Sequence, residues 1–127
     1  NLTTEKLAWA ADLCGVKSGR DTDKWKEAHL TPGASSRVKA PSIAESPVNL
    51  ECRVKQEIPL GSHTMFLADV VSVSVDAAYL DEKGRFHLDE ASPICYSHGR
   101  YFTLGEALGK FGYSVDKKKK NGKRIGL

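Results

Sequence analysis

The chain has 127 residues, of which 40% are hydrophobic and 28% are charged. This length suits one domain, and the composition excludes a wholly disordered protein. No apolar stretch approaches the roughly twenty residues that cross a bilayer. The polar residues 1–5 also lack the apolar segment of a signal peptide. We therefore predict a cytoplasmic protein without membrane contact.

The basic side chains are concentrated at one end of the chain. Up to Val115, 13 Lys and Arg residues stand against 15 Asp and Glu, whereas residues 116–127 hold six basic side chains and one acidic side chain. We interpret residues 116–127 as a basic, flexible tail that could touch an anion or nucleic acid. The remainder has no basic patch with interleaved aromatic residues, so we do not expect nucleic acid to be the main partner.

Neither the cysteines nor the histidines have the spacing of a metal site, and we predict no bound metal. Cys14, Cys52 and Cys95 contain no C-x-x-C motif, and the four histidines are scattered singly. Cys14 falls at a helix end and Cys52 within a strand pattern, so both are interpreted as small buried hydrophobes. Reduced cysteines agree with the cytoplasm.

Apolar residues at helical spacing predict two short helices in the first thirty residues. Thr3 or Thr4 can cap the first helix, and Gly15 ends its apolar run. Asp21 can cap the second helix, over residues 22–30.

Alternation of apolar and polar residues then predicts strands. Residues 31–47, with three prolines, form a long connection, and strands follow over residues 48–55 and 66–75. The apolar phase of the second strand slips by one residue at Val70–Val71. A β-bulge or a change of face explains the slip, and both are common where strands curl into a barrel.

Further elements are shorter: a turn over residues 79–84, a strand over 94–96 and a helical turn over 104–108. The fold class is therefore mainly β, with two short N-terminal helices. Three or four strands cannot close a barrel, and their edges need another element. We expect the chain to be a piece of a larger protein.

Five stretches of sequence carry a resemblance to a known family. They are CGVKSGRD at 14–21, DKW at 23–25, SPVNLEC at 46–52, GSHTMF at 61–66 and YSHGRYF at 96–102. Their order and spacing resemble the flavin reductase-like family, and most closely the flavoredoxin branch of the FMN-binding split β-barrels. The resemblance implies that residues 1–115 form the C-terminal part of such a domain, without its N-terminal strands. Many relatives have Gly-Asp-His where this chain has Gly61-Ser62-His63.

The resemblance implies roles for four of the candidate residues, and the local amides and charge suggest one for the fifth, Ser18. His63 matches a histidine beside flavin and nicotinamide, which makes it the candidate catalytic residue, and an imidazole can donate a hydrogen bond near neutral pH. Lys24 would supply the positive charge that a reduced flavin needs near N1 and O2. Tyr96 and Trp25 would lie against the cofactor. Ser18 lies in a loop suited to a phosphate or a partner subunit.

Without the resemblance, the local sequence suggests a purely structural role for each of these five residues. Lys24 could be an exposed lysine on a short helix, and Trp25 a buried aromatic on the face of that helix. Tyr96 could pack in a core, His63 could be a strand-end histidine bonded to a carbonyl, and Ser18 could belong to a polar connection.

The resemblance implies an FMN-binding enzyme of the flavin reductase type, which passes hydride or electrons from NAD(P)H through bound FMN and forms a homodimer. Two alternatives stay open. One is an electron-transfer flavoprotein module without NAD(P)H activity of its own, and the other is a flavin-free truncated fragment that only dimerises.

Overall fold

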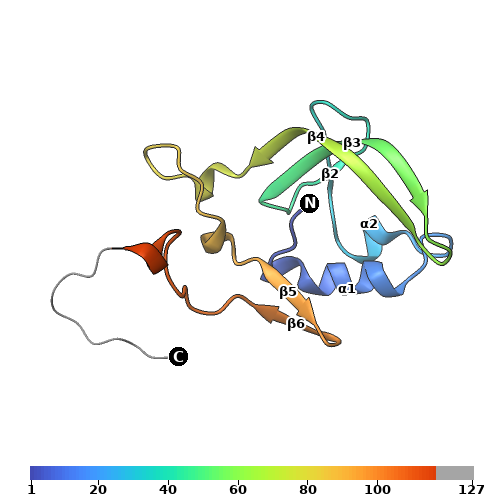
Figure 1. The fold of residues 1–127 in the computed structure, drawn as a ribbon. Helices are drawn as coiled ribbons and strands as arrows, with labels where there is room; N and C mark the ends of the chain where they lie inside the picture. The colour runs from blue at the N-terminus through green and yellow to red at the C-terminus, as the bar shows by residue number, and fades with distance from the viewer. Residues whose placement is uncertain (117–127) are drawn as a thin grey trace.

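The computed structural model describes residues 1–116 (Figure 1). The predicted basic tail therefore lies outside the described residues, apart from its first residue. Asp116 lies with its carboxylate 3.0 Å from the Lys110 ammonium.

The first helical segment follows the predicted pattern. A 3-10 turn, η1 (Glu5–Leu7), leads into α1 (Ala8–Val16), and Leu7 and Ala10 turn their side chains inward. Thr4 precedes the segment but makes no side-chain cap. The apolar spacing, rather than a threonine cap, accounts for the helix.

The second helix is shorter than predicted and begins later. α2 (Lys24–Glu27) is a single turn, whose cap is Asp23 and not Asp21. The Asp23 carboxylate accepts from the Lys26 amide at 3.3 Å. The turn ends because the chain passes into His29 with a left-handed φ of 54°, which a continuing helix excludes.

The long connection after α2 contains a small two-stranded sheet of its own. β1 (Pro32–Gly33) pairs antiparallel with β2 (Ser42–Ile43). The Glu45 carboxylate accepts from the Thr31 amide at 3.0 Å, which closes the base of this loop.

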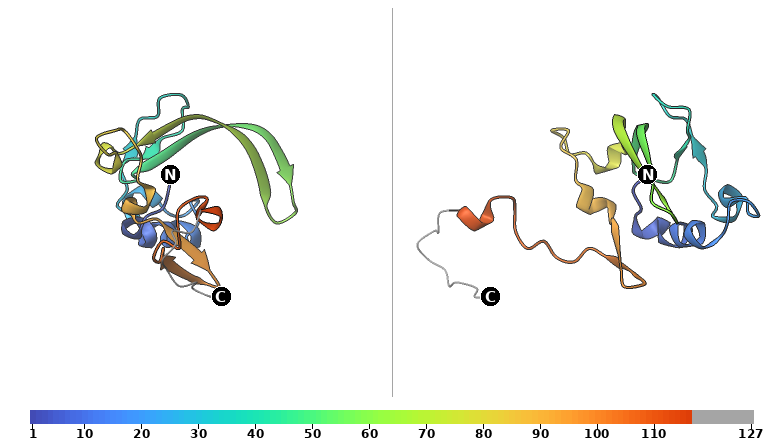
Figure 2. Two further views of the ribbon diagram at one scale, coloured as in Figure 1. Left: turned by 60° about the vertical axis from the view of Figure 1, so that its left-hand side comes forward. Right: turned by 45° about the vertical axis from the view of Figure 1, so that its right-hand side comes forward.

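A long antiparallel hairpin is the main β element. β3 (Val48–Pro59) pairs with β4 (Thr64–Val75), and both strands exceed their predicted lengths. Of the two explanations for the phase slip at Val70–Val71, the structure shows the β-bulge, because Glu51 pairs with Ser72 and Cys52 with Val70, which leaves Val71 without a partner. A second irregularity, between Val54 and Gln56, has no counterpart in the prediction. Bulges bend strands, and the hairpin arches in Figure 2.

The rest of the described chain consists of short elements. Two 3-10 turns, η2 (Ala77–Tyr79) and η3 (Leu88–Ala91), lead to a hairpin of β5 (Ile94–Ser97) and β6 (Arg100–Thr103). β6 was not predicted. Its turn has positive φ at both central residues, His98 and Gly99, as a type I′ hairpin turn requires. The helical turn predicted over residues 104–108 is wrong, and the last element is η4 (Tyr113–Val115).

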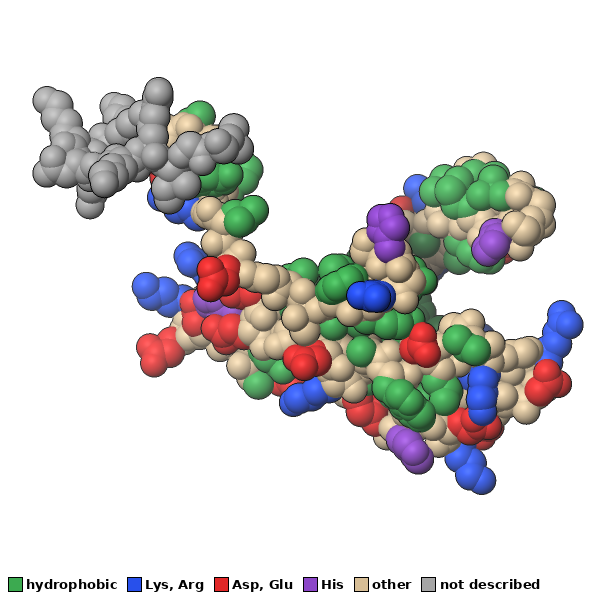
Figure 3. All heavy atoms as spheres, turned by 90° about the horizontal axis from the view of Figure 1, so that it is seen from below, with side chains coloured by type: hydrophobic (Ala, Val, Ile, Leu, Met, Phe, Trp, Pro, Cys, Tyr) green, Lys and Arg blue, Asp and Glu red, His purple; other side chains and the backbone are tan. Residues whose placement is uncertain are grey.

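Within residues 1–116, the three two-stranded sheets stay separate and unclosed, and the buried apolar core is small. It consists of Leu7, Ala10, Ala28, Val48 and Ala91. Many large apolar side chains of the described residues are at least half exposed, among them Trp9, Val54, Phe66 and Val70. Hydrophobic side chains lie at the surface in several patches (Figure 3). Much apolar surface therefore has no cover within residues 1–116.

The cysteines show the consequence of this missing cover. Cys52 is exposed and Cys14 half-buried, so the prediction that both are buried is wrong. All three thiols are free.

Within residues 1–116, no helix has the length and apolar character needed to cross a membrane.

Candidate functional site

The corner between α1 and α2 holds three of the five candidate residues. Lys24 donates from Nζ to the carbonyl of Cys14 at 2.6 Å, across the loop that joins the two helices. The carbonyl end of a helix is its negative end, so a half-buried ammonium is stabilised there. Ser18 accepts from the Arg20 amide at 3.2 Å. Lys24 thus has a structural partner besides any cofactor.

Trp25 lies on the same short helix but is not a buried core residue. Its side chain is 36% exposed. His29, four residues further on, stacks on Trp9 with ring centroids 6.4 Å apart. Because the Trp25 ring is partly open, it is available to a ligand as well as to packing.

His63 lies at the far end of the β3–β4 hairpin. Leu60 donates its amide to the His63 carbonyl at 2.8 Å, and Gly61 adopts a φ of 82° that favours glycine. The Ser62 hydroxyl lies 2.8 Å from Nδ1 of the exposed His63 ring. When the serine donates this hydrogen bond, the ring proton sits on Nε2, which leaves an outward N–H donor.

Tyr96 forms an aromatic pair with a residue that the sequence did not suggest. Tyr96 on β5 meets Tyr101 on β6 edge to face, at a centroid distance of 5.1 Å. Tyr101 donates to the Asp12 carboxylate at 3.0 Å, which ties the β5–β6 hairpin to α1. This hydrogen bond raises the pKa of Tyr101. Tyr96 is 65% exposed, so it is not the core residue of the plainer interpretation.

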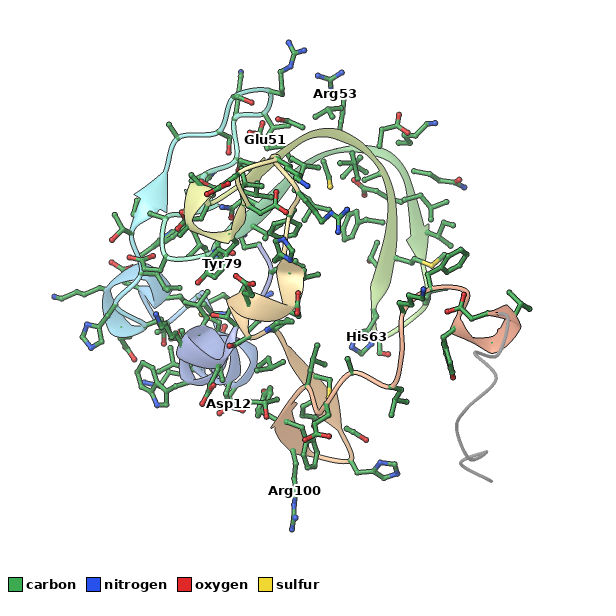
Figure 4. All side chains as sticks on the ribbon, turned by 90° about the vertical axis from the view of Figure 1, so that its left-hand side faces the viewer. Asp12, Glu51, Arg53, His63, Tyr79 and Arg100 are labelled. Carbon is green, nitrogen blue, oxygen red and sulfur yellow. The ribbon has the colours of Figure 1, made fainter. Side chains whose placement is uncertain are left out.

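The structure places Lys24 and Tyr96 near α1 and leaves His63 apart from that helix. The contact from Lys24 and the contact from the tyrosine pair both end on the last turns of α1, at Cys14 and Asp12. Within the described residues, the only side-chain hydrogen bond of His63 is with Ser62. The left view of Figure 2 and the stick view of Figure 4 both show the hairpin tip standing away from α1.

The inner face of the arched hairpin is apolar. Figure 4 shows Arg53 on the outer side of the arch, so its neighbours Cys52 and Val54 face inward by strand alternation. Cross-strand pairs extend this inner face, among them Leu50 with Val73 and Cys52 with Val70. These side chains are mostly exposed, so the face is open to a covering strand or to a ligand.

The residues at the α1 corner fit the needs of a flavin. A flavin protein places a cation or donors at the pyrimidine edge of the ring and aromatic or apolar groups against its faces. An ammonium has three N–H donors, and Cys14 uses one from Lys24, which leaves two. Trp25 and Tyr96 are open aromatic surfaces near α1. Residues 1–116 hold no group of three His, Cys, Asp or Glu arranged for a metal ion.

Comparison with known proteins agrees with this assignment. A family model described as a flavin reductase like domain matches residues 1–105. An uncharacterised protein of Archaeoglobus fulgidus is 40% identical over 102 residues, which cover 80% of this chain and 55% of that protein.

Two solved structures are similar in fold. Flavoredoxin of Desulfovibrio vulgaris (Miyazaki F) is 27% identical with a TM-score of 0.79, over 90% of this chain and 62% of that one. Nitrilotriacetate monooxygenase component B from Bacillus cereus is 25% identical with a TM-score of 0.73, over 86% of this chain and 57% of that one. The chain thus spans less than two thirds of each of these relatives.

The strands and short helices are those of the flavin reductase split barrels, with sheets that remain unclosed in the part of the chain that the structure describes. The chain belongs to the flavin reductase-like family.

Proposed function

We propose that this chain forms part of an FMN-dependent oxidoreductase of the flavin reductase type, which takes hydride or electrons from NAD(P)H. The family match over residues 1–105 is the observation that carries the proposal. The exposed Trp25 and Tyr96 rings and the two remaining N–H donors of Lys24 support a flavin site near α1. The three free thiols agree with a cytoplasmic location, which we also propose.

Each candidate residue then has a defined task. Bound FMN supplies a ring that accepts hydride and passes electrons on. Lys24 directs its two remaining N–H donors to the pyrimidine edge, and Ser18 contributes a hydroxyl beside it. Trp25 and Tyr96 exclude water from the ring faces. His63 orients the flavin or the nicotinamide through its Nε2–H, with Ser62 holding Nδ1.

The first experiment is an absorbance spectrum of the purified chain after FMN is added and the excess removed. Retained flavin bands, followed by bleaching under anaerobic NADH or NADPH, are the expected result. His63→Ala should slow that bleaching. A colourless protein would contradict flavin binding by this chain and favour a flavin-free fragment.

A second function is favoured by the similarity to a flavoredoxin. The chain could belong to an electron-transfer module that another protein reduces. In that case the flavin bands persist when NADH and NADPH are added, and they bleach only when a separate reductase is supplied.

We also propose that the protein works as a homodimer. Large apolar side chains are exposed on the hairpin, including Phe66 and Val70, and exposed strand edges favour pairing. A partner subunit also offers a way to bring a second α1 corner toward the His63 tip.

A further inference from the structure

The outer face of the β3–β4 hairpin carries a groove that the proposed flavin chemistry does not use. The groove has a volume of about 550 Å³ and is lined by Ser36, Arg37, Arg53 and Val71. Figure 4 shows Arg53 projecting outward from the arch, next to Glu51. Two arginines from separate segments, a loop and a strand, therefore converge on one hollow.

Glu51 fixes the loop that brings Arg37 to this groove. Its carboxylate accepts from the amides of three successive residues, Ser36 at 2.8 Å, Arg37 at 2.5 Å and Val38 at 3.2 Å, and from the Ser36 hydroxyl at 3.0 Å. Glu51 is only 8% exposed. Led by the Ser36 amide, these hydrogen bonds lower the pKa of Glu51, so it stays charged at neutral pH. The hydrogen bonds to Glu51 thus fix the backbone of Arg37 beside the groove.

The nearby acids are engaged elsewhere. Glu51 is committed to the loop amides, and Asp69, which pairs with Arg53 across the sheet, lies 3.3 Å from the Lys55 ammonium. Within residues 1–116, no carboxylate lies at ion-pair distance from the guanidinium of Arg37 or Arg53. Each guanidinium keeps its five N–H donors for a ligand.

The bulge supplies the remaining wall. Val71 is the unpaired residue of β4, and a bulge re-aims the side chain that it carries. It lines the groove beside the two guanidinium groups. Two guanidinium groups beside an apolar wall suit a ligand that combines an anionic group with an apolar part.

We propose that the groove between Arg37 and Arg53 binds a phosphate group, either free or carried by a nucleotide. Planar guanidinium groups match phosphate oxygens with two parallel hydrogen bonds, which a single ammonium cannot do. The site lies on the outer face of the hairpin, opposite the apolar inner face, and it does not depend on the proposed flavin function.

The test is an NMR titration of the full ¹⁵N-labelled chain with inorganic phosphate, AMP and adenosine, at an ionic strength held constant with chloride. Phosphate and AMP should shift the amides of residues 36–38 and of Arg53, and adenosine should not. Tighter binding of AMP than of phosphate identifies a nucleotide as the source, and equal binding identifies free phosphate.

Variants locate the site. Arg37→Ala and Arg53→Ala should each weaken phosphate binding about tenfold, and both side chains are exposed, so the fold should not suffer. Arg100→Ala on β6, far from Arg53 in Figure 4, is the matched control and should bind like the parent. The proposal is overturned if phosphate shifts no groove amide beyond the chloride control. It is equally overturned if the Arg53 variant binds unchanged or if the shifts spread over all exposed cations.

Discussion

A single carboxylate sets the conformation of the loop before β3. Glu51→Gln keeps the size of the side chain but removes the charge that three consecutive amides share. We expect the amides of residues 36–38 to exchange with solvent roughly tenfold faster, because a neutral acceptor holds them more weakly. Hydrogen exchange followed by NMR measures this. Glu57→Gln, an exposed change on the same strand, is the control, and equal acceleration in both variants would contradict the assignment.

The same carboxylate makes the loop sensitive to acid. Hydrogen bonds from the Ser36 amide and its neighbours lower the pKa of Glu51 from the ordinary 4.5. The unfolded state therefore binds the proton more readily, so the stabilising contribution is present above the ordinary value and is lost as the pH falls below it. An NMR pH titration should show residues 36–38 losing protection in acid. The Gln variant should lack this transition, and an identical transition in it would exclude Glu51 as the cause.

Lys24 has a structural role that can be separated from a cofactor role. Lys24→Met removes the donor to the Cys14 carbonyl, and we expect the free energy of unfolding in urea to fall by about 1 kcal/mol. Lys26→Met, in the same turn and exposed, should change little. If Lys24 also faces flavin, FMN affinity should fall in the first variant alone. Unaltered FMN affinity would confine Lys24 to the helix end.

At the scale of single residues, the sequence predicted which residues belong to the candidate site better than it predicted their hydrogen-bond partners. The residues of the α1–α2 corner, Ser18 and Lys24, were predicted as candidates, but the bond from Lys24 to a carbonyl ten residues earlier was not. Tyr101 was missed as a site neighbour because its partner, Asp12, is 89 residues away. Such contacts depend on how elements pack, and local patterns carry no information about them.

The β5–β6 hairpin is held to α1 by the hydrogen bond from Tyr101. The bond to Asp12 raises the pKa of Tyr101 above the ordinary 10.0. The folded state then keeps the phenolic proton longer, so the stabilisation is present below the ordinary value and is lost as the pH rises through the raised one. An absorbance titration should show one tyrosine ionising late, absent in Tyr101→Phe and retained in Tyr79→Phe. A late tyrosine that survives in Tyr101→Phe would refute this anchor.

Among the helices and strands, predictions succeeded where the alternation of apolar and polar residues extended over enough residues to be recognised. The phase slip at Val70–Val71 lies in a run of ten alternating residues, and the bulge was found there. The four residues of β6 are too few to show a period. The helical turn expected over residues 104–108 does not form because Gly105 lies within it and Gly109 follows it, and so short a helix cannot offset the cost of nucleation.

For the whole molecule, the sequence predicted unclosed strands but not which apolar side chains lack cover. Alternation identifies the two faces of a strand, and it does not tell what lies opposite each face. Over most of the hairpin the outer face is polar, with Glu51, Arg53 and Ser74 on it. A single layer of structure over the inner face would therefore be enough to bury the apolar side chains of this part of the hairpin.

The tip of the hairpin differs, because it is apolar on both faces. Met65 and Leu67 share the outer face with Asp69 by strand alternation, and they are 42% and 45% exposed. Strands that cover the inner face would leave these two side chains in water. An apolar patch that one layer cannot cover is typical of a contact between subunits.

We therefore expect the outer face of the tip to join two copies of the chain. Leu67→Lys places a charge in that contact and should convert a dimer into a monomer in sedimentation velocity, with at least a tenfold weaker association. Ser74→Lys introduces the same charge on the same face of β4, near its far end, and should leave the dimer intact. If the Leu67 variant stays dimeric while the hairpin remains folded, the subunits meet elsewhere. A parent that sediments as a monomer would remove the homodimer itself, and the two-sided tip would then need a different partner.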